Sequence, residues 1–378
     1  MNWRVPLADI NFGPEEEEAV RKVVHSGWLS MGSVTQAFEE DFKTFTNSKH
    51  ALAMTNATAA LHLACLALGI GPGDEVILPS LTFVATANAV RYTGARVVFA
   101  DIDSLDDFSI SPHAIEARIT DQTKAVMVMH YGGFACDMTA IMEIADAHGL
   151  RVIEDAAHAV GASLEGKALG TWGDIGCYSF FANKNMTTGE GGMLVTNDDI
   201  LAEKCGILRS HGMTTLTWDR HRGHAYTYDV IDLGYNYRLD EIRAALGAVQ
   251  LGKVTKGNQR RAELVALYQK LLTQKIPEIR IPYREARGIS SHYIFPILLP
   301  DGTDKLAFMA GMKESGIQTS WHYPPVHHFS IYEAEWLSRN EKLPITEETA
   351  AREVTLPLYP TMREEQVEWV VEAINKTI

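Results

Sequence analysis

Short apolar strand patterns alternate with amphipathic helix patterns between residues 50 and 200, and this alternation constrains the fold most strongly. Helical patterns such as Ala59–Leu68 and Met138–His148 separate most of the strand patterns. The alternation predicts an α/β fold with a mostly parallel seven-stranded sheet and helices on both faces. The last strand follows its predecessor without room for a helix, so we expect it to run antiparallel. The seven expected strands are Ala51–Met54, Glu75–Leu78, Arg96–Phe99, Lys124–Met129, Arg151–Glu154, Gly176–Phe180 and Gly192–Thr196.

A smaller α+β domain is expected in the C-terminal part of the chain. Leu239–Leu251 and Asn258–Leu272 have the pattern of two long helices, and shorter strand-like runs such as His292–Leu299 follow. The 378 residues are enough for two domains. We therefore expect a large domain at residues 1–250 and a small C-terminal domain at residues 251–378.

Charge and cysteine usage exclude several classes of protein. The formal net charge of -14 argues against a nucleic-acid partner, which would call for a basic surface. The four cysteines are widely spaced and form no C-x-x-C pair, so neither a metal site nor a disulfide framework is expected. No signal-peptide core and no apolar run long enough to span a membrane occurs. We therefore expect a cytoplasmic protein that does not contact membranes.

Lys184 ends the apolar run Cys177–Asn183, and the flexible stretch Gly189–Gly192 follows it closely. For a lysine taken alone, a solvated surface charge is the commonest role. A lysine held at a strand end, however, can be partly desolvated, which lowers its pKa and makes its amine nucleophilic. Such an amine is what a Schiff base with pyridoxal 5′-phosphate (PLP) requires.

Asp155 ends an earlier strand and has the chemistry to act together with Lys184. A buried carboxylate is costly unless it meets a positive partner, and the protonated pyridine nitrogen of PLP is such a partner. His158 could hydrogen-bond the phenolic oxygen of the ring, although a structural histidine is equally consistent with the sequence. Ligands of open parallel sheets bind beyond the carboxyl ends of the strands, so we expect these side chains in one site.

A candidate phosphate site lies where the first strand runs into its helix. The amides of Thr58 and Ala59 and the Thr58 hydroxyl would open that helix, and a helix N-terminus favours an anion. Threonine and asparagine are also common helix caps, so this signal is weak alone. Ser179 could add a hydroxyl to the same phosphate. Phe83 could stack on the cofactor ring, and a plain core position is the alternative.

Several motifs, in order along almost the whole chain, give it a clear family likeness. The chain resembles the PLP-dependent nucleotide-sugar aminotransferases of the DegT/StrS type. The resemblance implies the aspartate-aminotransferase fold, PLP-dependent transferase fold type I, and a homodimer with active sites at the subunit interface. The motifs that carry it are Ser26–Leu29, Gly71–Val76, Pro79–Asn88, Glu154–His158, Lys184–Gly192, Gly234–Arg238, His322–His327 and Leu356–Pro360.

The resemblance also implies roles for individual residues. Lys184 matches the Schiff-base lysine, Asp155 the partner of the ring nitrogen, and His158 the residue near the phenolic oxygen. Asn236 matches an asparagine that reaches the phosphate from the neighbouring subunit. The residues that match the phosphate cradle are Thr58, Ala59 and Ser179. The residues in motifs on the substrate side are Trp28, Arg238 and His327.

The implied reaction is amino transfer from L-glutamate to a nucleotide-linked deoxy-keto-sugar, for amino-sugar and polysaccharide biosynthesis. We expect the keto group at C4, with C3 as the second choice. A cyclitol or aminoshikimate-type aminotransferase would share the cofactor site and remains open, as does a non-catalytic PLP-binding sensor. Sugar dehydratases of the family carry histidine in place of the lysine, so Lys184 favours amino transfer. The segment Thr217–His224 could contact the nucleotide diphosphate or form a solvated loop.

Overall fold

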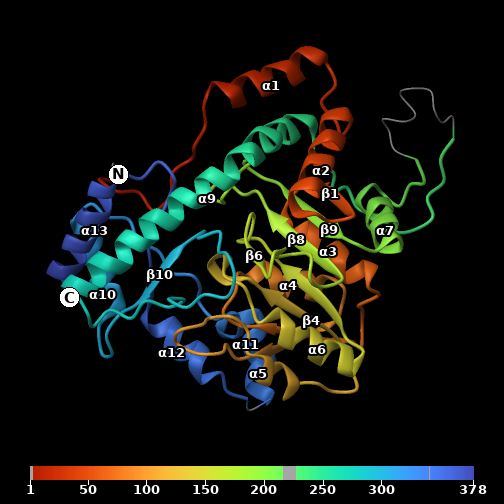
Figure 1. The fold of residues 1–378 in the computed structure, drawn as a ribbon. Coiled ribbons are helices and arrows are strands. Elements are labelled where there is room, and N and C mark those ends of the chain that lie inside the picture. Colours follow the sequence, from red (N-terminus) through yellow and green to blue (C-terminus); the bar gives the residue numbers. More distant parts are fainter. Residues whose placement is uncertain (1–2, 216–226, 340) are drawn as a thin grey trace.

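The computed structural model describes residues 3–215, 227–339 and 341–378, and a seven-stranded sheet forms its centre (Figure 1). The strand order is β1-β9-β8-β5-β4-β2-β3. Strand β9 runs antiparallel to both of its neighbours, and the other pairs are parallel. All seven predicted strands and the antiparallel seventh strand are confirmed. The strands are β1 (His50–Met54), β2 (Glu75–Pro79), β3 (Arg96–Ala100), β4 (Thr123–Met129), β5 (Arg151–Asp155), β8 (Ile175–Ser179) and β9 (Gly192–Thr196).

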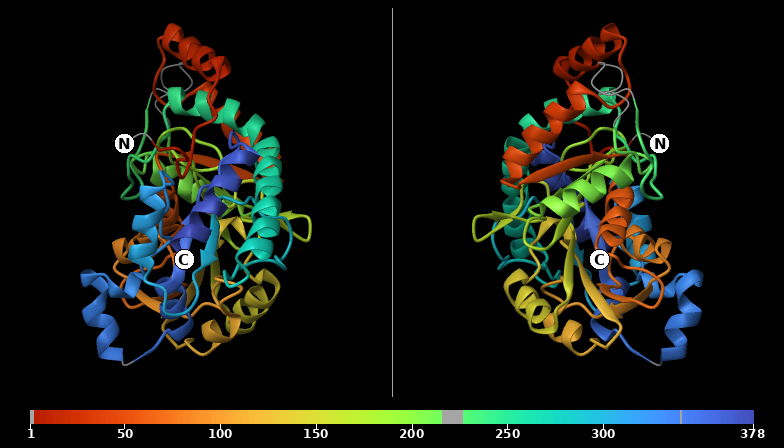
Figure 2. Two further views of the ribbon diagram at one scale, coloured as in Figure 1. Left: turned by 90° about the vertical axis from the view of Figure 1, so that its left-hand side faces the viewer. Right: turned by 90° about the vertical axis from the view of Figure 1, so that its right-hand side faces the viewer.

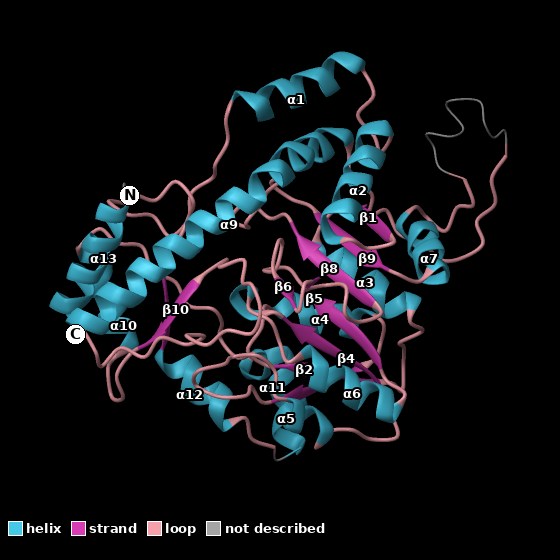
Figure 3. Ribbon diagram, viewed as in Figure 1, coloured by secondary structure: helices cyan, strands magenta, loops and turns pink. Residues whose placement is uncertain are grey.

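Helices cover both faces of the sheet, as the alternating pattern predicts (Figure 3). Apolar side chains of α3 (Ala57–Ala67), α4 (Val84–Tyr92) and α7 (Asp199–Arg209) form a core with one face. The other face is covered by α2 (Ser33–Thr46), α5 (Pro112–Glu116), α6 (Met138–His148) and the first part of α9 (Glu241–Lys275). The described part of the sheet is therefore buried between two helical layers.

Helix α9 is one continuous helix of 35 residues, so the prediction of two helices with a break between Leu251 and Asn258 is wrong. The segment between them contains Gly252 and Gly257 but no proline. A glycine costs a helix only about 1 kcal/mol relative to alanine, and packing against α1 (Pro14–Ser26), α2 and α13 (Glu364–Thr377) offsets this cost. Figure 2 shows α9 along one side of the molecule in both views.

A separate apolar cluster lies around the C-terminal half of α9. It includes the antiparallel pair β10 (Phe295–Leu298) and β11 (Glu353–Leu356), with α10 (Lys305–Glu314) and α13 packed on it. Val5 belongs to the same cluster, and both ends of the described chain lie on this side of the molecule (Figure 1). The predicted domain boundary between residues 250 and 251 falls inside α9. The division into two domains therefore stays a prediction.

The remaining short elements connect these layers. They are the hairpin β6 (Ser163–Leu164) and β7 (Lys167–Ala168), the helices α11 (Ser330–Arg339) and α12 (Pro344–Arg352), and the 3-10 turns η1 (Tyr131–Gly133) and η2 (Val326–His328). Within the described parts of the chain, no helix is both long and apolar enough to cross a membrane.

Glu154 fixes the segment that leads into β8 against the end of β5. Its carboxylate is fully buried and accepts hydrogen bonds from the amides of Gly170 (2.6 Å), Trp172 (2.6 Å) and Gly173 (2.7 Å). The ring of His130 supplies a fourth contact, with Nε2 2.9 Å from Oε2. Because Glu154 alternates with Asp155 along the strand, these bonds stabilise β5 from the side opposite to the neighbouring aspartate.

Glu154→Gln is expected to lower the free energy of unfolding by about 3 kcal/mol, because an amide NH₂ group would then face backbone N–H donors in a buried site. Urea denaturation measures the change. The control is Glu348→Gln, whose carboxylate is exposed and pairs with Arg352 on the same helix. It should change the stability by less than about 0.5 kcal/mol. Equal effects of the two substitutions would contradict this role of Glu154.

Candidate active site

A cavity of about 440 Å³ lies at the carboxyl ends of the parallel strands. The strand register brings these ends together, because Met129 of β4 lies opposite Asp155 of β5 and Asp155 lies opposite Cys177 of β8. The predicted site residues that line this cavity are Thr58, Phe83, Asp155, His158, Ser179 and Lys184. Residues from four separate parts of the sequence therefore meet in one place.

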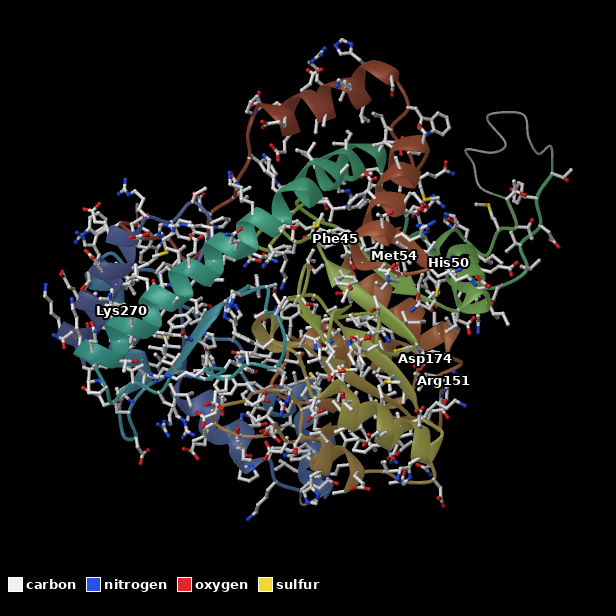
Figure 4. The ribbon with its side chains drawn as sticks, in the orientation of Figure 1. Phe45, His50, Met54, Arg151, Asp174 and Lys270 are labelled. Atoms are coloured by element: carbon white, nitrogen blue, oxygen red, sulfur yellow. The ribbon has the colours of Figure 1, made fainter. Side chains whose placement is uncertain are left out.

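A larger cavity of about 940 Å³ lies away from these residues. It is bounded by the end of α2, the β6–β7 hairpin and the middle of α9, and Phe45, labelled in Figure 4, lines it. None of the described residues that line it carries a carboxylate, and Lys184 is not among them. The chemistry of the side chains therefore places the candidate active site in the smaller cavity.

Lys184 follows β8 and presents its amine to the smaller cavity. Its Nζ lies 4.1 Å from the ring centroid of Tyr293. Burial lowers the pKa of Lys184 to about 7, although the negative charge of Asp155 opposes this shift. A large fraction of the amine is therefore neutral and nucleophilic near neutral pH, as the sequence predicts for a desolvated lysine.

Asp155 has a buried carboxylate, 4 % exposed, that is held by neutral donors. Its Oδ2 accepts a hydrogen bond from the Thr86 hydroxyl (2.8 Å), and its Oδ1 accepts one from the Ala157 amide (3.1 Å). Burial raises the pKa of Asp155, and these two hydrogen bonds oppose the rise. Within the described ranges, Asp155 forms no ion pair. The charges of Lys184 and His130 also oppose the rise in the Asp155 pKa, without a direct contact to the carboxylate in the described ranges. The N–H of a pyridinium ring would supply that direct cationic partner and fits this place.

His158 is held as a neutral imidazole with a defined tautomer. The Gly132 amide donates to Nδ1 (3.2 Å), so the proton of the ring lies on Nε2, which is 3.0 Å from the hydroxyl of Tyr323. Burial lowers the pKa of His158 well below its usual value, and the charge on Lys184 adds to this effect. The side chain therefore donates its N–H to the Tyr323 hydroxyl, which lines the same cavity.

The turn between β1 and α3 forms the end of the cavity where a phosphate is expected. Asn56 caps α3, and its Oδ1 accepts the amide of Ala59 at 2.8 Å, so the Ala59 N–H already has a partner. Thr58 lines the cavity, whereas Ala59 does not. Gly192 lets this turn approach β9, because a Cβ atom at that position would lie 2.7 Å from the Ala57 nitrogen. This close approach explains why glycine is needed at the end of the stretch Gly189–Gly192 that follows Lys184.

Phe83 and the aromatic residues near it form one wall of the cavity. Phe83 is 54 % exposed, so it is not a core residue, and its ring centroid lies 5.8 Å from that of Tyr323. Sequence reasoning assigned no role to the further lining residues Tyr293, His322 and Tyr323. His322 and Tyr323 stand in a motif that carries the family resemblance, which is the signal that could have identified them.

Besides Ala59, four predicted residues do not line the cavity of their own chain. Asn236 is exposed, and Arg238 is partly buried beside β1. Trp28 lines a different cavity, between α1, α2 and α9. His327 is 1 % exposed, and its Nδ1 lies 2.7 Å from the hydroxyl of Ser80. Their roles toward a substrate or a neighbouring subunit stay predictions.

The segment Thr217–His224, a candidate for contact with a nucleotide diphosphate, lies outside the described residues.

The fold and the site together define the class of the protein. A mostly parallel seven-stranded sheet with a lysine and an aspartate at its carboxyl edge is the arrangement of PLP-dependent transferases of fold type I. The chain matches the DegT/DnrJ/EryC1/StrS aminotransferase family over residues 11–375. It belongs to this family and is an aminotransferase.

Relatives and solved structures are similar over the full length of the chain. The spore coat polysaccharide biosynthesis protein SpsC of Bacillus subtilis is 40% identical, with 100% of this chain and 98% of the relative covered. GDP-perosamine synthase of Escherichia coli O157:H7 is 37% identical, with 98% of each covered. The structure of Helicobacter pylori PseC, an aminotransferase involved in pseudoaminic acid biosynthesis, has a TM-score of 0.91 and 30% identity, with 99% and 98% covered.

One further structure shows the cofactor state of a neighbour. The putative sugar aminotransferase Spr1654 of Streptococcus pneumoniae was solved in a PLP form, with a TM-score of 0.89 and 25% identity, and 100% of this chain and 98% of that chain are covered. Predicted fold and predicted family are thus both confirmed.

The lowered pKa of Lys184 predicts how the cofactor-free protein reacts with PLP. Below pH 7 the amine is protonated and unreactive, and above pH 7 it is neutral. The yield of the Lys184 adduct after borohydride reduction, measured by mass spectrometry, should therefore rise with a midpoint near pH 7. Asp155→Asn removes a charge that favours the ammonium form, so its midpoint should be lower. A midpoint close to the ordinary lysine value of about 10.4 would contradict the burial of the amine.

Proposed function

We propose that the chain is a PLP-dependent sugar aminotransferase that transfers the amino group of L-glutamate to the C4 keto group of a nucleotide-linked deoxy-keto-sugar. The observation that carries the proposal is the placement of Lys184 and Asp155 in one cavity of about 440 Å³. Two relatives with names from spore coat polysaccharide biosynthesis and GDP-perosamine synthesis support a nucleotide-sugar acceptor. The PLP form of a structural neighbour supports the cofactor.

The cavity residues fit PLP, which when bound supplies an electron sink for charge that develops at the donor α-carbon. The Asp155 carboxylate would accept the ring N–H, and the hydrogen bonds from Thr86 and Ala157 hold the carboxylate in place. The N–H of His158 holds the Tyr323 hydroxyl at the wall of the cavity, and this pair would orient a phenolic oxygen. Thr58 and Ser179 also line the cavity, and their hydroxyls would hold a phosphate.

Lys184 is the group that moves protons in this proposal. Its amine would take the proton from the donor α-carbon and later return a proton to the product, as a general base and then a general acid. A pKa of about 7 suits both tasks at neutral pH, because both protonation states are populated. The aromatic rings of Phe83, Tyr293 and Tyr323 line the cavity and would limit the access of water to that amine.

We propose that the protein works as a cytoplasmic homodimer in which Asn236 completes the phosphate site of the neighbouring subunit. Two facts support this reading. Asn236 is exposed, and it is not among the residues that line the cavity of its own chain. The family resemblance supplies the role, and the exposure leaves the side chain available to a second subunit.

A panel of keto-sugar nucleotides tests the function. Wild-type protein with PLP and L-glutamate should aminate a C4-keto sugar, with the product detected by mass spectrometry. Lys184→Ala should lower the turnover by at least about 10⁴-fold, because proton transfer and covalent catalysis are both lost. Amination of keto-cyclitols in preference to every keto-sugar nucleotide would overturn the proposed acceptor. Full turnover by Lys184→Ala would overturn the mechanism.

Mixed dimers test the shared site. Lys184→Ala and Asn236→Ala subunits should each be weakly active as pure dimers. In a mixed dimer, the site of the Asn236→Ala chain has an intact lysine and receives an intact asparagine from its neighbour. Mixing should therefore restore up to about half of the activity per mixed dimer. If Asn236 served its own chain, every site would have one defect and mixing would restore nothing.

A further inference from the structure

A buried carboxylate in β11 is connected to the active-site cavity by hydrogen bonds. Glu353 is fully buried, and its Oε1 accepts the hydroxyl of Thr355 at 2.6 Å. The same hydroxyl oxygen lies 2.8 Å from Nδ1 of His322, and His322 lines the cavity together with Lys184. Ser320 pairs with Thr355 as an antiparallel bridge, which places His322 opposite Glu353. The His322 amide accordingly donates to Glu353 Oε2 at 2.9 Å.

These contacts fix the tautomer of the histidine while Glu353 is ionised. Thr355 then gives its one hydroxyl proton to the Glu353 carboxylate, so its oxygen can only accept the proton on Nδ1 of His322. Nε2 of His322 then carries a lone pair. Because the ring lines the cavity, this nitrogen is available to a ligand there. Burial lowers the pKa of His322 to about 3, and the charge on Lys184 adds to this effect, so the ring does not keep a second proton.

We propose that His322, Thr355 and Glu353 form a proton relay that takes a proton from the ammonium group of the amino donor and stores it on the buried carboxylate. The N–H bond of the ammonium breaks, and Nε2 of His322 gains the proton. Nδ1 passes its proton to the Thr355 oxygen, whose own proton moves to Glu353 Oε1. One proton has then moved from the amine to the carboxylate, and no group has been oxidised or reduced. The donor in this step rests on the proposed function, whereas the relay rests on the hydrogen bonds.

The electrostatic surroundings allow the carboxylate to hold that proton. Burial raises the pKa of Glu353 to about 8, against the hydrogen bonds from Thr355 and His322 and the charge of Lys305. Lys305 does not form an ion pair with Glu353 in the described part of the chain, because its Nζ donates to the Ala350 carbonyl and lies 3.3 Å from the ring centroid of Trp321.

Two phenols also face the relay. The hydroxyl of Tyr131 donates to the carbonyl of His322, and Tyr323 follows His322 in the chain. Burial raises the pKa of both phenols well above the usual value, so both stay neutral. Burial also lowers the pKa of Lys305 to about 8, against the charge of Glu353, so the ammonium group beside the relay titrates in the same range. Glu353 is therefore the group within the relay itself that titrates near pH 8, and the Glu353→Gln variant separates its titration from that of Lys305.

The cofactor-free protein provides the first test. Infrared difference spectra should show the C=O band of a protonated carboxyl group below pH 8 that disappears above pH 8 and is absent in Glu353→Gln. Nitrogen-15 NMR of His322 should show the proton on Nδ1 above pH 8 and on Nε2 below it. Thr355→Val should abolish this change of tautomer, and Thr355→Ser should preserve it. If Thr355→Val leaves the tautomer changing with pH as in the wild type, the relay is wrong.

A matched control separates the relay from the general effect of removing a buried acid. Glu16 is 1 % exposed and bonds to Gln250 and Lys253, on α9 and outside the residues that line the cavity. Burial opposes a low pKa at Glu16, but these hydrogen bonds lower it. Glu16→Gln should therefore keep both the infrared band and the tautomer change of the wild type. If the infrared band disappears in Glu16→Gln, the band belongs to Glu16 and not to Glu353, and the proposal is wrong.

The loaded enzyme provides the second test. In single-turnover experiments with the amino donor, the wild-type rate should rise as pH increases through about 8, because ionised Glu353 accepts the proton. Glu353→Gln should lack this rise and be about 100-fold slower at pH 9. A wild-type rise that survives in Glu353→Gln would overturn the relay. If no amino donor reacts at all, the proposed function is wrong. The hydrogen-bonded relay is still supported in that case if the carboxyl band and the tautomer change of His322 are observed as expected.

Discussion

The structure depends on one electrostatic constraint, the burial of the Asp155 carboxylate without a direct ion pair among the described residues. The carboxylate lies at the end of β5 with neutral hydrogen-bond donors around it. Removing such a charge from water costs several kcal/mol unless a partner compensates for it. The fold bears this cost because the parallel register places Lys184, His158 and the α3 turn around the same space. A cofactor with a basic ring nitrogen would supply the positive partner that lowers this cost.

The strands achieve this placement through interactions away from the cavity. Four donors hydrogen-bond to the Glu154 carboxylate. These bonds attach the segment before β8 to β5 on the opposite side from Asp155. Gly192 allows β9 to pass close to the α3 turn. Catalytic geometry at the carboxyl edge is therefore determined by buried polar contacts and by small residues behind it.

The sequence predicts the sheet and most of the residues that line the cavity, because both follow from short local sequence patterns. Each strand is a short apolar run, and Asp155, Ser179 and Lys184 end or follow strands whose carboxyl ends must meet. The continuity of α9 could not be predicted from local sequence, since tertiary packing offsets the cost of Gly252 and Gly257. The capping of Ala59 by Asn56 depends on the rotamer of one side chain, and a sequence does not specify it.

The contacts around His322 and Glu353 show a second limit of local reasoning. These residues are separated by 31 positions, and only the pairing of Ser320 with Thr355 brings them together. No spacing rule for helices or strands predicts such a contact. Long-range pairing of this kind has to be observed in a structure, even where the motif that contains the histidine is recognised.

The most direct test of the account is the protonation state of the cofactor ring in the loaded enzyme. Nitrogen-15 NMR of PLP labelled at the ring nitrogen reports whether that nitrogen carries a proton. The account predicts a protonated nitrogen at neutral pH in the wild type and an unprotonated one in Asp155→Asn. An unprotonated nitrogen in the wild type, or the same signal in both proteins, would contradict the pairing of Asp155 with the ring.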